Sequence, residues 1–215
     1  MKFTPEKHHR QSIRLQGYDY SQLGFYFVTL CTYQRQCWFG DIRDEKMHLN
    51  QIGKLVRYEW LKSSLIRQEI ELDEWVIMPN HLHGIVIITE NYKDTQKQNF
   101  HEMKRLKGEL QQIKGEQIKG ERRSPLQGIA KQKPRSLTSL IGGFKASVTR
   151  QINQLCNHQN PPIWQRNYYE SIIRDEQHLN YVRQYIHNNP QAWTNDPENP
   201  KNHGQFQYLL LNLPF

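Results

Sequence analysis

One stretch limits the possible folds of this chain more than any other, Met78-Pro-Asn-His-Leu-His-Gly-Ile-Val-Ile-Ile88. Its Pro-Asn pair is a turn signal, and the apolar, β-branched residues that follow predict a strand. Because side chains alternate along a strand, His81 and His83 are expected on the same face. Two imidazoles side by side on a rigid strand form an incomplete metal site. Two surface histidines near a strand end are the simpler alternative.

The segments around this stretch have two different hydrophobic periods, which together predict an α+β fold. Strands are expected at 24–33, 70–78, 82–88 and about 163–172, with shorter ones at Gln36–Phe39 and Met47–Leu49. The 70–78 strand should pair with the histidine strand across the Pro79-Asn80 turn.

Helices are expected near 50–66, 137–153 and 175–189, where apolar residues recur at helical spacing. Ser136 and Asp175 are the expected N-caps of the second and third helices. Pro190 disfavours helical backbone at the residue before it, so the third helix should end at Asn189.

The expected domain of residues 23–190 follows an N-terminal basic arm (1–22) and precedes a C-terminal extension (191–215), in which Gln207–Leu213 is a candidate last strand. A flexible insertion is expected at 91–135, because this segment has almost no aromatic residues and too few apolar ones to offset the entropy of ordering. A short helix near Phe100–Leu110 is the exception. The arm and the insertion are either solvated or in contact with DNA.

The net charge of +8 indicates a polyanionic partner, either nucleic acid or an anionic membrane. No run of 18 apolar residues is present to span a membrane, and the polar N-terminus lacks the apolar region of a signal peptide. The chain is therefore expected inside the cell, with nucleic acid as its partner. Its three cysteines are too few and too irregularly spaced for a disulfide framework or a zinc ribbon.

Five residues are candidates for contacts with nucleic acid: Arg14, Lys145, Arg150, Trp164 and Arg166. Arginine and lysine can meet phosphate, and aromatic rings near 164–169 suit stacking on single-stranded bases. A solvated charged face and aromatic packing on the sheet are the alternatives for the same residues.

Four motifs in this order resemble those of the single-tyrosine HUH transposases, above all the subgroup associated with repetitive extragenic palindromes (REP) in bacteria. The motifs are Ser12-Ile-Arg-Leu15 with Tyr18-Asp-Tyr-Ser21 and Tyr26-Phe-Val-Thr29; Met78-Pro-Asn-His-Leu-His-Gly84; Trp164-Gln-Arg-Asn-Tyr-Tyr169; and Tyr185-Ile-His-Asn-Asn-Pro190. The resemblance spans residues from about 10 to 190, apart from the insertion.

The resemblance implies a ferredoxin-like antiparallel sheet with helices packed on one face. It implies that His81, His83 and Asn189 bind Mg²⁺ or Mn²⁺ and that Tyr185 is the nucleophile. The implied reaction nicks and rejoins single-stranded DNA at hairpin or palindromic repeats through a 5′-phosphotyrosine. The protein would be a monomer or homodimer in the bacterial cytoplasm, associated with the nucleoid and not with a membrane.

Two other functions stay open at this stage. One is a sequence-specific DNA-binding protein of the same fold without turnover, and the other is a histidine–metal hydrolase without a covalent step. The presence of both histidines, the tyrosine and the asparagine favours the transposase, because a protein that only binds DNA does not need all four.

Overall fold

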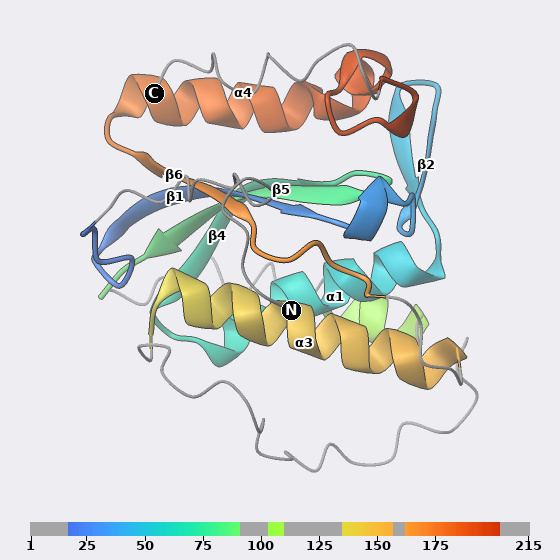
Figure 1. The fold of residues 1–215 in the computed structure, drawn as a ribbon. Coiled ribbons are helices and arrows are strands. Elements are labelled where there is room, and N and C mark those ends of the chain that lie inside the picture. Colours follow the sequence, from blue (N-terminus) through green and yellow to red (C-terminus); the bar gives the residue numbers. More distant parts are fainter. Residues whose placement is uncertain (1–16, 91–102, 110–134, 157–161, 203–215) are drawn as a thin grey trace, which may run out of the picture.

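The structure is a computed structural model that describes residues 17–90, 103–109, 135–156 and 162–202. Its centre is an antiparallel sheet of four strands in the order β4-β5-β1-β6 (Figure 1). The strands are β1 (Gly24–Cys31), β4 (Ile70–Ile77), β5 (His81–Ile88) and β6 (Tyr169–Ile173). A separate ribbon pairs β2 (Gly40–Arg43) with β3 (Lys46–Leu49).

Helices cover both faces of the sheet, so the described part of the chain has three layers. Helices α1 (Gln51–Ile66) and α3 (Leu137–Cys156) lie on one face, and α4 (Glu176–Ala192) lies on the other (Figure 1). The described residues also include three short 3₁₀ segments: η2 (Tyr33–Arg35), η3 (Trp193–Asn195) and η4 (Pro200–Asn202).

The predicted α+β class with an antiparallel sheet is confirmed, but the helices do not all pack on one face. The reason lies in β5, whose side chains are buried on both faces. Leu82 belongs to the core beneath α1 and α3, whereas Ile85 packs under α4 with Val182 and Ile186. A strand that is apolar on both faces needs cover on both.

The histidine strand lies directly against α1, and Gly84 allows this approach. A Cβ atom at Gly84 would stand 2.9 Å from Cζ2 of Trp60, a fully buried side chain of α1. The glycine after the two histidines therefore lets the helix pack close to the strand that carries them.

The predicted helix caps are confirmed. Ser136 Oγ accepts a hydrogen bond from the Ser139 amide at 3.2 Å, and Asp175 accepts one from the His178 amide at 2.7 Å. The predicted end of the third helix is wrong, because α4 continues through Pro190 to Ala192. A proline so close to the end of a helix removes little of the helical hydrogen bonding.

Two predicted strands differ from the structure. Residues 36–39 form no strand; their aromatic side chains Trp38 and Phe39 pack on the core, and β2 begins only at Gly40. The segment predicted as a strand at 163–172 contains one isolated bridge at Trp164, and β6 begins only at Tyr169. Between them Asn167 has a φ of +70°, which interrupts extended backbone.

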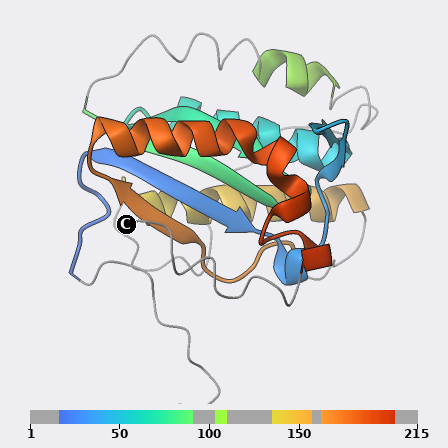
Figure 2. The same cartoon turned by 90° about the horizontal axis from the view of Figure 1, so that it is seen from above.

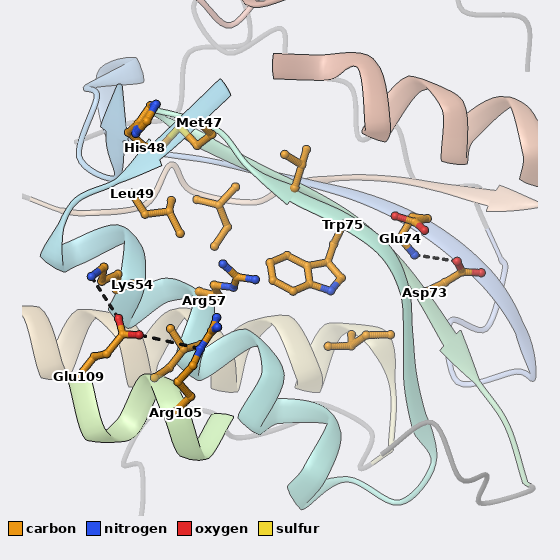
Figure 3. Close-up of a pocket in the computed structure, with 14 residues that line it drawn as sticks. Met47, His48, Leu49, Lys54, Arg57, Asp73, Glu74, Trp75, Arg105 and Glu109 are labelled. Carbon is orange, nitrogen blue, oxygen red and sulfur yellow. Dashed lines mark hydrogen bonds and ion pairs between the residues drawn. The ribbon is translucent and has the colours of Figure 1, made fainter. Parts of the chain in front are cut away.

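The predicted helix in the insertion is present at 103–109. Its Leu106 is buried, and Glu109 forms an ion pair with Lys54 of α1 at 3.1 Å. A cavity of about 750 Å³ lies between this helix, β3, β4 and α1, with Trp75 against its wall (Figure 3). The remainder of the insertion, the arm up to residue 16 and the Gln207–Leu213 segment lie outside the described residues. None of the described helices is long and apolar enough to cross a membrane.

Candidate active site

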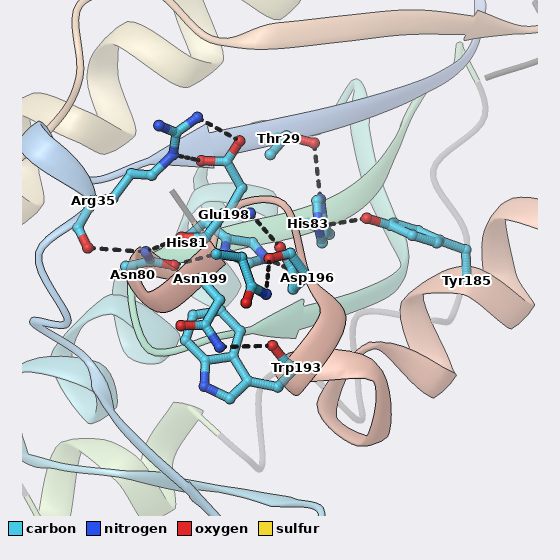
Figure 4. A network of polar contacts seen from close by, with 11 residues as sticks. Thr29, Arg35, Asn80, His81, His83, Tyr185, Trp193, Asp196, Glu198 and Asn199 are labelled. Carbon is cyan, nitrogen blue, oxygen red and sulfur yellow. Dashed lines mark hydrogen bonds and ion pairs between the residues drawn. The ribbon is translucent and has the colours of Figure 1, made fainter. Parts of the chain in front are cut away.

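The turn before β5 fixes the first histidine. Asn80 is fully buried, and its Nδ2 donates hydrogen bonds to the backbone oxygens of Arg35 at 2.9 Å and Glu198 at 2.7 Å (Figure 4). These two bonds orient the amide so that Oδ1 lies 2.9 Å from His81 Nδ1. Since Oδ1 can only accept, we infer that Nδ1 carries the proton and that His81 Nε2 has a free lone pair.

The second histidine lies beside the first on the face that α4 covers. The two ring centroids are 4.5 Å apart, as expected for alternate residues of one strand. His83 Nδ1 lies 2.8 Å from Thr29 Oγ1 of the neighbouring strand β1. Its Nε2 faces the Tyr185 hydroxyl of α4 at 3.2 Å.

A buried carboxylate completes this group, and it comes from the segment after α4. Asp196 Oδ2 lies 3.9 Å from His81 Nε2, and one ligand atom from each of His81, His83 and Asp196 lies within 4.8 Å of the others. All three side chains are buried. Two imidazoles and a carboxylate are a donor set that suits divalent ions with mixed nitrogen and oxygen ligands.

An ion pair between Glu198 and Arg35 holds the segment that carries Asp196. Glu198 Oε2 lies 2.7 Å from Arg35 Nε, and the Glu198 amide donates to Asp196 Oδ1 at 2.6 Å (Figure 4). Asn199 adds a hydrogen bond from Nδ2 to the Trp193 oxygen at 2.9 Å. These contacts close the 193–199 segment over the histidine pair.

Two buried polar atoms of the site have no hydrogen-bond partner within the described ranges: His81 Nε2 and Asn189 Oδ1. Asn189 has only 2% of its surface exposed. An imidazole nitrogen and an amide oxygen buried in this way both offer a lone pair, which a cation can satisfy. The structure brings the predicted residues His81, His83 and Tyr185 together, and Asn189 of α4 lies within interaction range of His81 and Tyr185.

Burial sets the protonation states. It lowers the pKa of both histidines below its usual value, and for His83 the neighbouring His81 lowers it further. Burial also raises the pKa of the Asp196 carboxyl and, together with the Asp196 charge, that of the Tyr185 phenol. At neutral pH the imidazoles are therefore neutral, as binding of a metal ion would require, and the phenol keeps its proton.

The residues predicted to contact nucleic acid are not grouped at this site. Trp164 is only 8% exposed and packs on Phe39 and Phe144 in the core, so neither ring face is open to a base. Lys145 Nζ donates to the backbone oxygens of Gln165 and Asn167. Arg150 and Arg166 are exposed, and their contact with nucleic acid stays a prediction. Arg14 lies outside the described residues.

Sequence reasoning missed four residues here: Thr29, Asn80, Asp196 and Glu198. The two acidic residues lie in the Asn- and Pro-rich stretch Asn195-Asp-Pro-Glu-Asn-Pro200, directly after the helix that carries Tyr185. Such a turn-forming stretch close to a candidate nucleophile was the available signal for them. The predicted extension at 191–215 accordingly contributes to the site, although the outer domain boundaries stay a prediction.

Comparisons with known proteins give one clear relative. The chain is 38% identical over 200 residues to an uncharacterized protein of Haemophilus influenzae (strain ATCC 51907 / DSM 11121 / KW20 / Rd), covering 91% of this chain and 96% of the other. No protein-family model matches the chain. A solved structure described as a REP-associated tyrosine transposase bound to a REP hairpin is 16% identical, with a TM-score of 0.43, over 85% of this chain and 74% of that one.

Proposed function

We propose that this chain, which belongs to the same family as the Haemophilus influenzae protein, is a metal-dependent tyrosine nuclease and transposase that acts on single-stranded DNA. The observation that carries the proposal is the 3.2 Å contact between the Tyr185 hydroxyl and His83 Nε2, beside a buried His-His-Asp group. A structural tyrosine at the end of a buried histidine pair would need neither the carboxylate nor Asn189.

The proposed metal ligands are His81, His83 and Asp196, with Asn189 as a fourth. The unpartnered lone pairs of His81 Nε2 and Asn189 Oδ1 fit a cation. Nitrogen donors favour Mn²⁺ over Mg²⁺, which prefers oxygen ligands and water. Such an ion would polarise the scissile phosphate and offset the negative charge that develops during attack.

The residues around the metal ligands prepare the attack. Asn80 and Thr29 fix the two imidazole rings, and α4 positions the Tyr185 hydroxyl next to His83 Nε2. In the reaction the Tyr185 oxygen forms a bond to phosphorus while the bond from phosphorus to the 3′ oxygen breaks. Tyr185 loses its phenolic proton, the leaving oxygen gains a proton, and the product is a 5′-phosphotyrosine beside a free 3′-hydroxyl.

The raised pKa of Tyr185 shows why a cation is part of the proposal. Burial and the Asp196 charge both oppose the phenolate. His81, His83 and Asp196 would hold a divalent ion, whose charge would reverse the sign of the local charge and lower the free energy of the phenolate. The covalent link conserves the energy of the phosphodiester, so the strand can be rejoined without a nucleotide cofactor.

The substrate that we propose is a DNA hairpin with single-stranded flanks, which the motif resemblance suggests, in the bacterial cytoplasm at the nucleoid. The test incubates purified protein with labelled hairpins from the sequences that flank its gene, with Mn²⁺ or Mg²⁺, and separates the products under denaturing conditions. A labelled band at the mass of protein plus DNA is expected, and chelation should remove it.

Tyr185→Phe removes one hydroxyl and keeps the ring, so it should bind the hairpin normally and form no adduct. Tyr181→Phe is the matched control, one turn earlier on α4 and 51% exposed, and should keep adduct formation. Hairpin binding without an adduct in the wild-type protein would support a DNA-binding protein without turnover. Metal-dependent cleavage without an adduct would support a hydrolase.

A further inference from the structure

Tyr169 lies in the same row of residues across the sheet as His83. The register places His83 of β5 opposite Thr29 of β1, and Thr29 opposite Tyr169 of β6. Residues directly opposite each other in an antiparallel pair point to the same face, so Tyr169 shares the α4 face with His83. Two strand spacings of about 4.8 Å place Tyr169 about 10 Å from His83.

The part of the sheet around Tyr169 is beside α4 rather than under it. Helix α4 packs chiefly on β4 and β5, and Figure 2 shows β1 and β6 emerging at its side. Strand β6 is an edge of the sheet, and Tyr169 keeps 38% of its surface exposed. The Tyr169 ring is therefore partly accessible to solvent, next to a site in which His81, His83 and Asp196 are all buried.

The backbone that carries Tyr169 is held in place. Lys145 Nζ of α3 donates to the backbone oxygens of Gln165 at 3.1 Å and Asn167 at 2.5 Å, just before β6 begins. Pairing of Tyr169 with Thr29 fixes it from the other side. A ring on a rigid strand loses little conformational entropy when a ligand binds to it.

A positive charge lies within electrostatic range of this ring. Glu198 holds the Arg35 guanidinium at 2.7 Å, and this hydrogen-bonded ion pair raises the pKa of Arg35. The Arg35 side chain keeps 27% of its surface exposed. A partly exposed aromatic ring within electrostatic range of a guanidinium suits a nucleotide, because the ring can stack on the base and the guanidinium can meet the phosphate.

The geometry points to Tyr169 as a stacking platform for a base of the single strand next to the phosphate that Tyr185 attacks, with the strand running over β1 and β6 past Arg35. This inference rests on the proposed function, which places the phosphate at His83. The separation of about 10 Å limits the stacked base to about three nucleotides from that phosphate, at about 3.4 Å per stacked nucleotide.

The experiment measures DNA binding in the absence of metal, with every variant combined with Tyr185→Phe so that no strand is cut. The probe is a fluorescein-labelled DNA hairpin with a thymidine tail on each side, and one set of probes carries a single abasic position moved along the tails. Tyr169→Ala is compared with Tyr169→Phe, which keeps the ring, and with Tyr181→Ala, which removes another exposed tyrosine.

We expect Tyr169→Ala to weaken hairpin binding about 5- to 150-fold, while Tyr169→Phe and Tyr181→Ala keep most of the affinity. One abasic position should weaken binding to the Tyr169 protein but not to Tyr169→Ala, since each change removes the same contact. Tyr169→Leu controls for folding, because it keeps an apolar side chain without a stacking face. Its affinity should fall as in Tyr169→Ala with an unchanged melting temperature.

The inference would be overturned if Tyr169→Ala bound the hairpin as tightly as the protein that keeps Tyr169. It would also be overturned if the losses of affinity from Tyr169→Ala and from the abasic position were additive at every position. So would a fall in affinity explained by a lower melting temperature in both Tyr169→Ala and Tyr169→Leu, which would make Tyr169 a packing residue. These results are separable from the proposed function. A wild-type protein that forms no adduct with metal refutes the nuclease, while the binding data report on stacking alone.

Discussion

Replacing Asp196 with asparagine separates the proposed metal binding from folding. Asp196→Asn keeps the size of the side chain and an oxygen that can accept the Glu198 amide at 2.6 Å. Because burial raises the pKa of the Asp196 carboxyl, the charged form opposes folding at neutral pH. That unfavourable contribution grows as pH rises through the carboxyl pKa, and the variant lacks it. The metal-free variant should therefore be at least as stable as the wild-type protein at pH 7.

In the presence of Mn²⁺, by contrast, Asp196→Asn should be less stable than the wild-type protein. At a Mn²⁺ concentration of about 100 times the dissociation constant, binding adds about 2.7 kcal/mol to the free energy of unfolding. Changes to residues that only support a ligand weaken metal binding about 10- to 100-fold, so losing a charged ligand should cost about 100-fold or more. The remaining stabilisation is then about 0.4 kcal/mol. For a chain of this size the Mn²⁺-induced rise in melting temperature falls from about 5–11 °C to about 1–2 °C.

Thermal unfolding with and without Mn²⁺ measures both effects in one assay. Asp73→Asn is the matched control, because Asp73 pairs with Arg183 of α4 at 2.5 Å on β4 and has no part in the His-His-Asp group. It should lower the melting temperature and leave the Mn²⁺-induced rise intact. A full Mn²⁺-induced rise in Asp196→Asn would refute the reasoning and return the third ligand to Asn189.

Four further predictions rest on the same structure. Burial lowers the pKa of Lys145 to about 8, so the unfolded chain, whose lysines titrate near 10.4, binds more protons between these values. The free energy of unfolding should therefore rise from pH 8 to about 10 in the wild-type protein and rise less in Lys145→Met, as measured by urea unfolding. Leu106→Ala should lower the free energy of unfolding by about 2 kcal/mol, the low end for buried leucines, because its short helix can detach. Replacing 96–130 with a Gly/Ser linker should keep the fold at a lower melting temperature, and loss of all folded protein would contradict this. Hairpin binding should weaken linearly on a log–log plot against salt, and salt-independent affinity would speak against phosphate contacts.

Local patterns in the sequence were enough to place the two histidines. Alternation along one strand put His81 and His83 on one face, and no other information was needed. The four-residue spacing of Tyr185 and Asn189 placed them on one side of a helix in the same way. The roles assigned to these four residues stay predictions, and what the structure adds is that they meet.

The carboxylate could not be predicted by this route. Asp196 lies in no periodic element, and its position depends on Glu198, which contacts Arg35 and Asn80, both distant in the sequence. Burial likewise decides the role of Trp164, whose ring packs in the core although its sequence context is typical of a stacking residue. Cover on both faces of the sheet, by contrast, was readable from the continuous apolar run Ile85–Ile88.

The hydrogen bonds of Asn80 join parts of the site that the ribosome synthesises at different times. The Asn80 amide holds Arg35, 45 positions earlier, and Glu198, 118 positions later. At about 5–20 residues per second, a ribosome needs about 6–24 s to pass from Asn80 to Glu198. Throughout that interval the nascent chain carries both histidines without the carboxylate. The pair can therefore gain its third partner only when the strands and α4 have already been made, so the proposed cutting activity would begin only after the 193–199 segment has been synthesised.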